Sequence, residues 1–246
     1  MIYESHLAAA EAGAWTLDGS IAWDGIDLSM AGTERELHTT LHDAALIEGY
    51  LPVLAARLLP LLWDDVDATA VLSLELYEGL KHYTALKRYL DRVGFEAAGD
   101  AEAGLVVARQ RALSRVYAAG DVPEHLTHFT CSELFAAYFF LRIARRTREP
   151  VLRDLLGYMS RDEFRHAAAA GDVLRQRLAR APSETERVLE AARHFRHYGS
   201  DVVEVPVAEA NDFEAIMAMN RKIRWICGLA VTEHLEHEEG AAHADQ

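Results

Sequence analysis

Two arrangements of acidic residues and histidines constrain the fold of this chain more than any other feature. Glu163 and His166 stand three residues apart in a segment rich in alanine and leucine, and this spacing places both side chains on one face of a helix. Glu133 lies 30 residues before Glu163, and their midpoint falls in the helix-breaking run 147–150. Two antiparallel helices joined there would each rise about 20 Å from the turn and bring Glu133 level with Glu163.

The first half of the chain repeats this arrangement. Glu48 and Glu78 are also 30 residues apart, a break at 60–65 lies between them, and His82 follows Glu78 by four residues. Four helices that carry inward-facing glutamates and two histidines are typical of bundles that bind two metal ions through carboxylates. The spacing therefore predicts an all-α chain built on a carboxylate-bridged di-iron bundle.

The residues around these acids favour burial. Glu133 is flanked at helical spacing by Phe129 and Phe140, and Glu48 and Glu163 have similarly apolar neighbours. A lone buried carboxylate is strongly destabilising unless it is paired or bound to a cation. Oxygen ligands with a few imidazoles suit iron or manganese better than zinc. We therefore favour a metal site over the alternative, a buried network of hydrogen bonds.

His82 lies on the apolar stripe of its helix, where a single histidine would more often be an ordinary core residue. Its position among the acids favours a metal ligand instead. Other histidines lack such a setting, and we expect them at the surface: His38, His42, His125, His128, His194, His197, His234 and His237.

The composition indicates a globular protein with a substantial core. Half of the 246 residues are hydrophobic, and the formal net charge of −14 argues against nonspecific binding to nucleic acid. Cys131 and Cys227 are too few for a disulfide framework, which favours a reducing cytoplasm. We see no signal peptide and no membrane span, because prolines and charges interrupt the most apolar stretch, 44–63.

The order of helix signals predicts one domain over 1–246. We expect an irregular N-terminal arm over 1–32, a bundle core over 33–180, and C-terminal helices with a frayed tail over 183–246. Capping boxes at Thr33 and Ser183 mark two helix starts, and Gly199 is suited to close the second of these helices. The expected helices are 33–59, 67–94, 103–118, 121–146, 150–180, 183–199 and 210–236, with one extended segment at 202–207.

With these residues in view, the chain resembles the soluble, bacterial-type acyl-carrier-protein desaturases of the ferritin-like superfamily. The resemblance covers about 35–180 and rests on Asp162-Glu163-Phe164-Arg165-His166 and on Glu48-Gly-Tyr-Leu-Pro52. It implies a ferritin-like four-helix bundle with additional flanking helices, two iron ions (with manganese allowed at one position), and Asp162 as the residue that orients a metal-bound histidine. The ligands that we expect are Glu48, Glu78, His82, Glu133, Glu163 and His166.

The second helix departs from the family pattern. The family has a bridging glutamate where this chain has Gly79. Glu78 is four residues before His82 and shares its face, so it can take over the role. Glu75 lies about 10 Å from His82 along the helix axis, which we take as too far. The missing carboxylate predicts an asymmetric site, a site open to substrate or oxygen, or one too weak to hold two metals.

By this resemblance the protein is an O2-dependent oxidase or desaturase of an acyl or similar apolar chain on an acyl carrier protein. A ferredoxin-like donor would supply the electrons, and the assembly would be a homodimer. Basic residues that could bind an acidic carrier, or form a solvated face, are Arg142, Arg145, Arg146 and Arg148. The alternatives are a di-iron oxygenase that hydroxylates or N-oxygenates a small molecule, and a ferritin-like binding module without catalysis.

Overall fold

The computed structural model describes residues 1–95, 105–107, 109–110, 113, 121–203 and 212–230. Every regular element in these ranges is helical. The main helices are α1 (Ile2–Ala12), α2 (Leu28–Thr33), α3 (Arg35–Leu58), α4 (Val66–Arg92), α6 (Val122–Arg146), α7 (Pro150–Arg180), α8 (Thr185–Arg193) and α10 (Phe213–Ile226). Short 3-10 turns are η1 (Trp23–Gly25), η2 (Leu59–Leu61), η5 (Pro182–Glu184) and η6 (Tyr198–Asp201).

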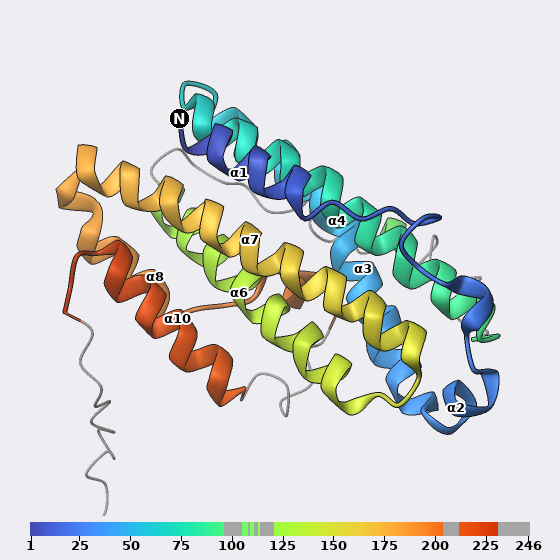
Figure 1. The fold of residues 1–246 in the computed structure, drawn as a ribbon. Coiled ribbons are helices and arrows are strands. Elements are labelled where there is room, and N and C mark those ends of the chain that lie inside the picture. The colour runs from blue at the N-terminus through green and yellow to red at the C-terminus, as the bar shows by residue number, and fades with distance from the viewer. Residues whose placement is uncertain (96–104, 108, 111–112, 114–120, 204–211, 231–246) are drawn as a thin grey trace, which may run out of the picture.

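Helices α3, α4, α6 and α7 form a four-helix bundle made of two antiparallel pairs (Figure 1). Pro150 begins α7, and the preceding Glu149 accepts hydrogen bonds from the backbone N–H groups of Val151 and Leu152. Proline has no N–H that this first turn would leave unpaired, and Glu149 satisfies the next two donors. The hairpin between α6 and α7 therefore turns where the sequence predicts it.

A polar layer crosses the middle of the bundle between two apolar clusters. One cluster lies toward the turn between α3 and α4 and includes Leu58, Leu126 and Leu174. The other lies toward the turn between α6 and α7 and includes Leu41 and Leu155. Because both clusters exclude water, the glutamates and histidines between them are held in an apolar surrounding.

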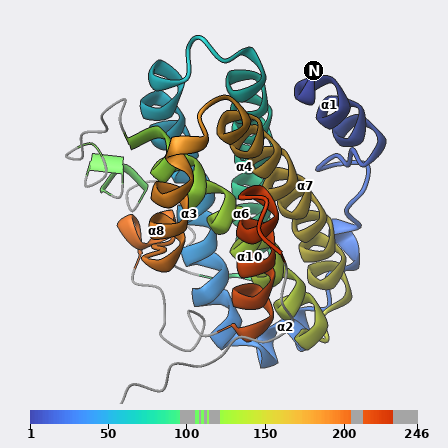
Figure 2. The same ribbon diagram turned by 90° about the vertical axis from the view of Figure 1, so that its left-hand side faces the viewer.

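In the described part of the chain, further helices flank the bundle. Helix α10 packs on α6 and α7, and α8 packs on α6 (Figure 2). Helix α1 packs on α4 and α7. The prediction of an irregular arm over 1–32 is wrong for α1 and α2. Helix α1 docks largely through polar contacts, His6 with Asp172 at 3.2 Å and the Tyr3 N–H with Asp67 at 2.9 Å, which a search for apolar periodicity does not detect.

Several predicted boundaries also differ from the structure. The Thr33 capping box does not form, because Thr33 ends α2. Glu34 stands at the N-cap of α3 without a side-chain capping bond, and its carboxylate accepts hydrogen bonds from the Thr147 hydroxyl and the Arg148 N–H. Helix α8 ends at Arg193 rather than near Gly199. The described part of the last helix ends at Ile226. The predicted helix over 103–118, most of the extended segment over 202–207, and the tail beyond 230 lie outside the described residues.

The stretch Arg35–Leu61 is long and apolar enough to cross a membrane by length and composition alone. Half of its most apolar 18-residue window is buried inside the protein. A core helix of a bundle passes the same test of length and composition.

Candidate metal centre

One side chain from each of three helices and two from the fourth converge in the polar layer. Glu48 comes from α3, His82 from α4, Glu133 from α6, and Glu163 and His166 from α7, and all five are buried. Their nitrogen and oxygen atoms form two groups in which every ligand atom lies within 4.8 Å of the others. The first position consists of Glu48, His82 and Glu163, and the second consists of Glu133, Glu163 and His166.

The two histidines present the same ring nitrogen to this layer. At the first position, His82 Nδ1 lies 2.8 Å from Glu163 Oε1 and 3.6 Å from Glu48 Oε2. At the second, His166 Nδ1 lies 3.0 Å from Glu163 Oε2 and 3.3 Å from Glu133 Oε2. The two oxygens of Glu163 therefore face different histidines, so this carboxylate stands between the two positions.

The donor atoms fit metal ions better than they fit one another. His82 Nδ1 is buried and has no well-aligned hydrogen bond, although two carboxylates face it. Each position offers one imidazole nitrogen and two carboxylate oxygens, a set suited to iron or manganese. At the first position the nitrogen faces carboxylate oxygens without a well-aligned hydrogen bond, an arrangement that suits a cation, whereas at the second His166 Nδ1 is hydrogen-bonded to Glu163 Oε2.

Burial and mutual charge shift the protonation of these groups strongly. Burial and the neighbouring Glu163 raise the pKa of Glu48 to about 6, and the same two causes raise the pKa of Glu133 well above its usual value. Burial opposes ionisation of Glu163 too, but His166 and His82 hold its pKa well below the usual value. Metal ions that bind here must displace protons from the two histidines, so binding is expected to release protons.

Each histidine has a second carboxylate behind it. His82 Nε2 lies 3.1 Å from Asp162 Oδ2, and His166 Nε2 lies 2.9 Å from Glu78 Oε2. Such partners fix the ring orientation of metal-bound histidines. Asp162 thus occupies the orienting place that we expected for it. Glu78, expected among the ligands, lies behind His166 and is outside both ligand groups, and its predicted coordination stays a prediction.

Arg165 joins these two supporting carboxylates. Its Nη2 lies 2.7 Å from both Glu78 oxygens and 2.8 Å from Asp162 Oδ1. Asp162 Oδ2 also accepts a hydrogen bond of 2.7 Å from the indole N–H of Trp15, whose ring stacks on His82. The sequence gives no signal for Trp15, because it lies in the segment that we expected to be irregular.

The volume at Gly79 is already occupied. A Cβ at this position would lie 2.0 Å from Leu51 Cδ1 and 3.2 Å from Glu48 Oε2. Any side chain at 79 would therefore require Leu51 to move. At the position where the family pattern has a glutamate, Leu51 of α3 therefore packs directly against Gly79 of α4.

Two solved structures share this fold. Both are point mutants of an R2-like ligand-binding oxidase, one with an aerobically and one with an anaerobically reconstituted Mn/Fe cofactor. The first has a TM-score of 0.52 and 14% identity over 92% of this chain and 85% of that chain. The second has a TM-score of 0.54 and 15% identity over 94% of each. The fold is ferritin-like. This confirms the predicted architecture, whereas at such low identity the likeness shows the fold alone.

The sequence itself matches no protein-family model and no curated protein. The structural neighbours are R2-like oxidases, and the resemblance to acyl-carrier-protein desaturases in particular is not confirmed. The comparison shows a ferritin-like bundle, and the geometry of this chain shows buried carboxylates and histidines placed for two metal ions.

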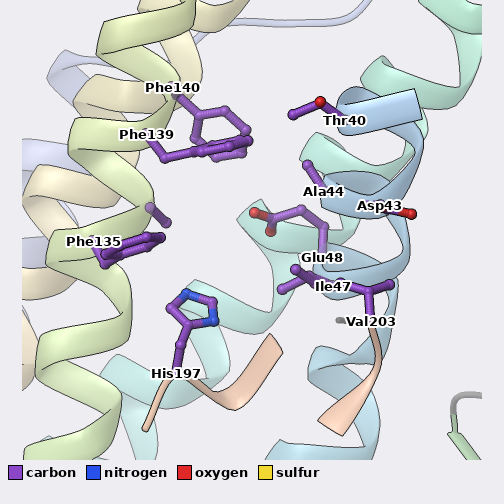
Figure 3. A pocket seen from close by; sticks show the side chains of 11 residues that line it. Thr40, Asp43, Ala44, Ile47, Glu48, Phe135, Phe139, Phe140, His197 and Val203 are labelled. Carbon is purple, nitrogen blue, oxygen red and sulfur yellow. The ribbon is translucent and has the colours of Figure 1, made fainter. Parts of the chain in front are cut away.

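An apolar pocket opens between α3 and α6, the neighbouring bundle helices that lie furthest apart. It encloses about 540 Å³ of empty space, including its open mouth. Glu48 points into it from α3 opposite Phe135 and Phe139 of α6 (Figure 3). The pocket therefore reaches Glu48 of the first position, and the rest of its lining is mostly apolar.

His197 reaches this pocket from the segment before η6 (Figure 3). Its Nδ1 accepts a hydrogen bond of 2.9 Å from the Gly199 N–H, and its ring packs edge-on against Phe135. Burial lowers the pKa of His197 to about 4, so the ring is neutral at physiological pH. It also lines a second cavity together with Glu48, Glu133 and Glu163. A neutral histidine thus stands between the apolar pocket and the acids.

The expectation that the remaining histidines lie at the surface is wrong for several of them. His38 and His125 are buried, and His42, His128 and His197 are half-buried. Aromatic neighbours explain the burial of His38, which contacts Tyr89 and Phe95 edge-on. His194 is exposed as expected, and His234 and His237 lie outside the described residues.

The basic cluster at the end of α6 is largely engaged within the chain. Arg142 pairs with Asp212 at 2.6 Å, Arg145 with Glu214 at 3.7 Å, and Arg148 with Glu34 at 3.6 Å. Only Arg145 and Glu214 are both exposed, and exposed pairs are weak and can exchange partners. Arg146 is exposed beside them, and the binding of an acidic carrier at this cluster stays a prediction.

Proposed function

We propose that this protein is an O2-dependent di-metal oxidase that acts on an acyl or similarly apolar chain. Its two metal ions would be two irons, or one iron and one manganese, as in the Mn/Fe cofactor of the structural neighbours. The observation that carries the proposal is the pair of buried ligand groups that share Glu163.

The metal pair would supply the reduction of oxygen and the oxidation of an unactivated carbon. The protein supplies the setting for this chemistry. Glu163 holds negative charge between the two positions, and Asp162 and Glu78 fix the rings of His82 and His166. The apolar clusters on either side of the polar layer keep bulk water away.

The pocket between α3 and α6 supports an apolar substrate. Ala44, Ile47, Phe139 and Phe140 form most of its wall, and a hydrocarbon chain gains free energy by leaving water for such a surface. Because Glu48 also lines the pocket, a chain bound there would place a carbon beside the first position. Desaturation and hydroxylation both begin with removal of a hydrogen from such a carbon, so hydroxylation is the second candidate reaction.

The partners in this proposal follow from the resemblance. The chain would be presented on an acyl carrier protein that binds near Arg146 and Arg148, and a ferredoxin-like donor would deliver electrons. We further propose a homodimer in the cytoplasm. Cys131 and Cys227 are both free thiols, which is compatible with that compartment.

Metal content and oxygen uptake test the proposed function. We expect anaerobically loaded protein to bind two metal ions per chain, and an acylated carrier protein to accelerate oxygen uptake more than the free fatty acid does. Equal acceleration by both would refute use of a carrier. A chain that binds no metal would refute the oxidase and favour a binding module without catalysis.

Filling the pocket is expected to reduce binding of an apolar chain. Ala136 is half-buried and lines both the apolar pocket and the neighbouring cavity at Glu133. In Ala136→Phe the added ring would occupy this space. We expect affinity for a fluorescent fatty acid to fall about tenfold or more, because the ring would remove roughly 1.4 kcal/mol of the free energy that the ligand gains by burial.

The matched control is Ala136→Ser, which preserves the volume of the side chain. Metal content of Ala136→Ser should equal that of the wild type. Metal content of Ala136→Phe is measured beside its fatty-acid affinity, because position 136 also lines the cavity at Glu133. Unchanged fatty-acid affinity in Ala136→Phe would show that the chain binds elsewhere.

A further inference from the structure

We propose that Glu75 is a ligand of the second metal position and replaces the carboxylate that Gly79 lacks. The proposal rests on the proposed two-metal function and names a ligand that the ferritin-like pattern does not place there. Three independent features of the structure support it: the packing at Gly79, the unpaired state of Glu75, and the level of Glu75 along the bundle.

Gly79 supplies no ligand, and Leu51 fills the space beside it. Leu51 Cδ1 would lie 2.0 Å from a Cβ at 79, so the space that a glutamate there would use belongs to Leu51. Glu78 is also committed elsewhere, because both its oxygens face Arg165 and one of them faces His166 Nε2. Helix α4 therefore needs another carboxylate if it is to supply one.

Glu75 is such a carboxylate, and no other described residue forms a hydrogen bond with it. Its side chain is 2% exposed, and neither carboxylate oxygen has a hydrogen-bond partner. Its surroundings are apolar and include Leu72, Phe129 and Ala170. By contrast, the equally buried Glu149 accepts hydrogen bonds from backbone N–H groups. A buried carboxylate without any partner is strongly destabilising, so its presence points to a cation.

Glu75 lies outside both ligand groups in the structure, and its height on α4 is nearer to the second position than to the first. It precedes Glu78 by three residues on α4, about 4.5 Å along the axis and on the same face. Glu78 Oε2 already lies 2.9 Å from His166 Nε2. The two-turn separation from His82 places Glu75 far from the first position but does not place it far from His166.

The electrostatic surroundings agree with this placement. Burial raises the pKa of Glu75 to about 8, and the charges that act on it belong to His166, Glu163, Glu78 and Arg165. These residues all contact or support the second position.

The consequence is a site with unequal halves. With Glu75, the second position would have four protein ligands: Glu75, Glu133, Glu163 and His166. The first would keep three, and one of them, Glu48, lines the apolar pocket. Glu75 would thus complete the second position, and the first would retain the room for oxygen or substrate next to the pocket.

Anaerobic titration with Co(II), followed by its visible absorption, tests the assignment. The wild type should bind two ions. In Glu75→Gln the second ion should bind at least about tenfold more weakly, and the absorption of the remaining ion should match that of the first position. The matched control is Glu48→Gln, which should weaken the first position and spare the second.

Thermal unfolding supplies a readout independent of activity. Glu75→Gln removes a buried unpaired acid, so the metal-free variant should have a higher Tm than the metal-free wild type. Its gain in Tm on adding metal should be smaller than that of the wild type if Glu75 binds metal. Two ions bound at wild-type affinity in Glu75→Gln would overturn the role of Glu75 alone, whereas a wild type that binds no ion would overturn the proposed function with it.

Discussion

Glu163→Gln is expected to abolish tight binding of both metal ions. Glu163 is the one residue that belongs to both ligand groups, and its two oxygens lie 2.8 Å and 3.0 Å from the two histidines. The amide cannot supply two anionic oxygens. It also lacks the negative charge that stabilises both protonated imidazoles. Changing a residue behind a metal ligand typically costs about 10–100-fold in affinity, so loss of a shared ligand should exceed about 100-fold at each position.

Two single-position variants serve as controls for this prediction. Glu48→Gln should affect only the first position, and Glu133→Gln only the second, because each belongs to one group. Metal content measured after anaerobic loading and desalting distinguishes the three variants. If Glu163→Gln retained one tightly bound ion, the two positions would not share this carboxylate.

The loss of Glu163 should also change the protonation of the histidines. Burial opposes the charged form of His82 and His166, and Glu163 is the largest favourable influence that holds their pKa well above the usual value. In metal-free Glu163→Gln the pKa of both rings should fall. Titration of the histidines by NMR would detect the change, and unchanged titration would contradict the central placement of Glu163.

The spacing of residues in the sequence predicted the fold and the converging side chains well. Glu133 and Glu163 meet because 30 residues with a break at their midpoint make two equal antiparallel arms, and Pro150 fixes the turn. The same reasoning applies to Glu48 and α4. These predictions depend on helix geometry, which is local and regular, and so could be made without knowledge of tertiary contacts.

A comparison of the two histidine-bearing helices with each other bears on the place of Glu78. Asp162 and Glu78 both stand four residues before a histidine, and each supports the histidine of the opposite helix. Aligning the two helices on His82 and His166 pairs Glu78 with Asp162, and Gly79 with Glu163. That alignment was available in the sequence and gives Glu78 the same place as Asp162, while the coordination of a metal by Glu78 stays a prediction.

Trp15 and His197 could not have been predicted in the same way. Trp15 reaches Asp162 across 147 positions of the chain, and His197 enters the pocket from a segment outside the bundle. Neither lies at a helical spacing from any other residue of the site. Their positions depend on how the flanking segments dock on the bundle, and periodicity contains no information about that docking.

Arg165 is the residue whose removal should most destabilise the polar layer. It faces Glu78 and Asp162, whose side chains are 5% and 2% exposed, and removing one partner of a buried ion pair typically costs about 3–5 kcal/mol. Lys81 also faces these carboxylates, at 3.8 Å and 3.5 Å, and should retain part of the stabilisation. We therefore expect a loss of about 3 kcal/mol in Arg165→Met.

For a chain of this size, such a loss should lower Tm by about 6–12 °C. Arg161→Met is the matched control, because Arg161 lies on the same helix but is exposed and only covers the ring of Tyr158. The difference between the two variants should also depend on pH. Their neighbours hold the pKa of Glu78 and Asp162 below the usual values in spite of burial, so this stabilisation is present above the unfolded pKa of about 4 and is lost as the pH falls through the folded values. Equal Tm values for Arg165→Met and Arg161→Met at pH 7 would mean that Arg165 does not neutralise the carboxylates behind the two histidines.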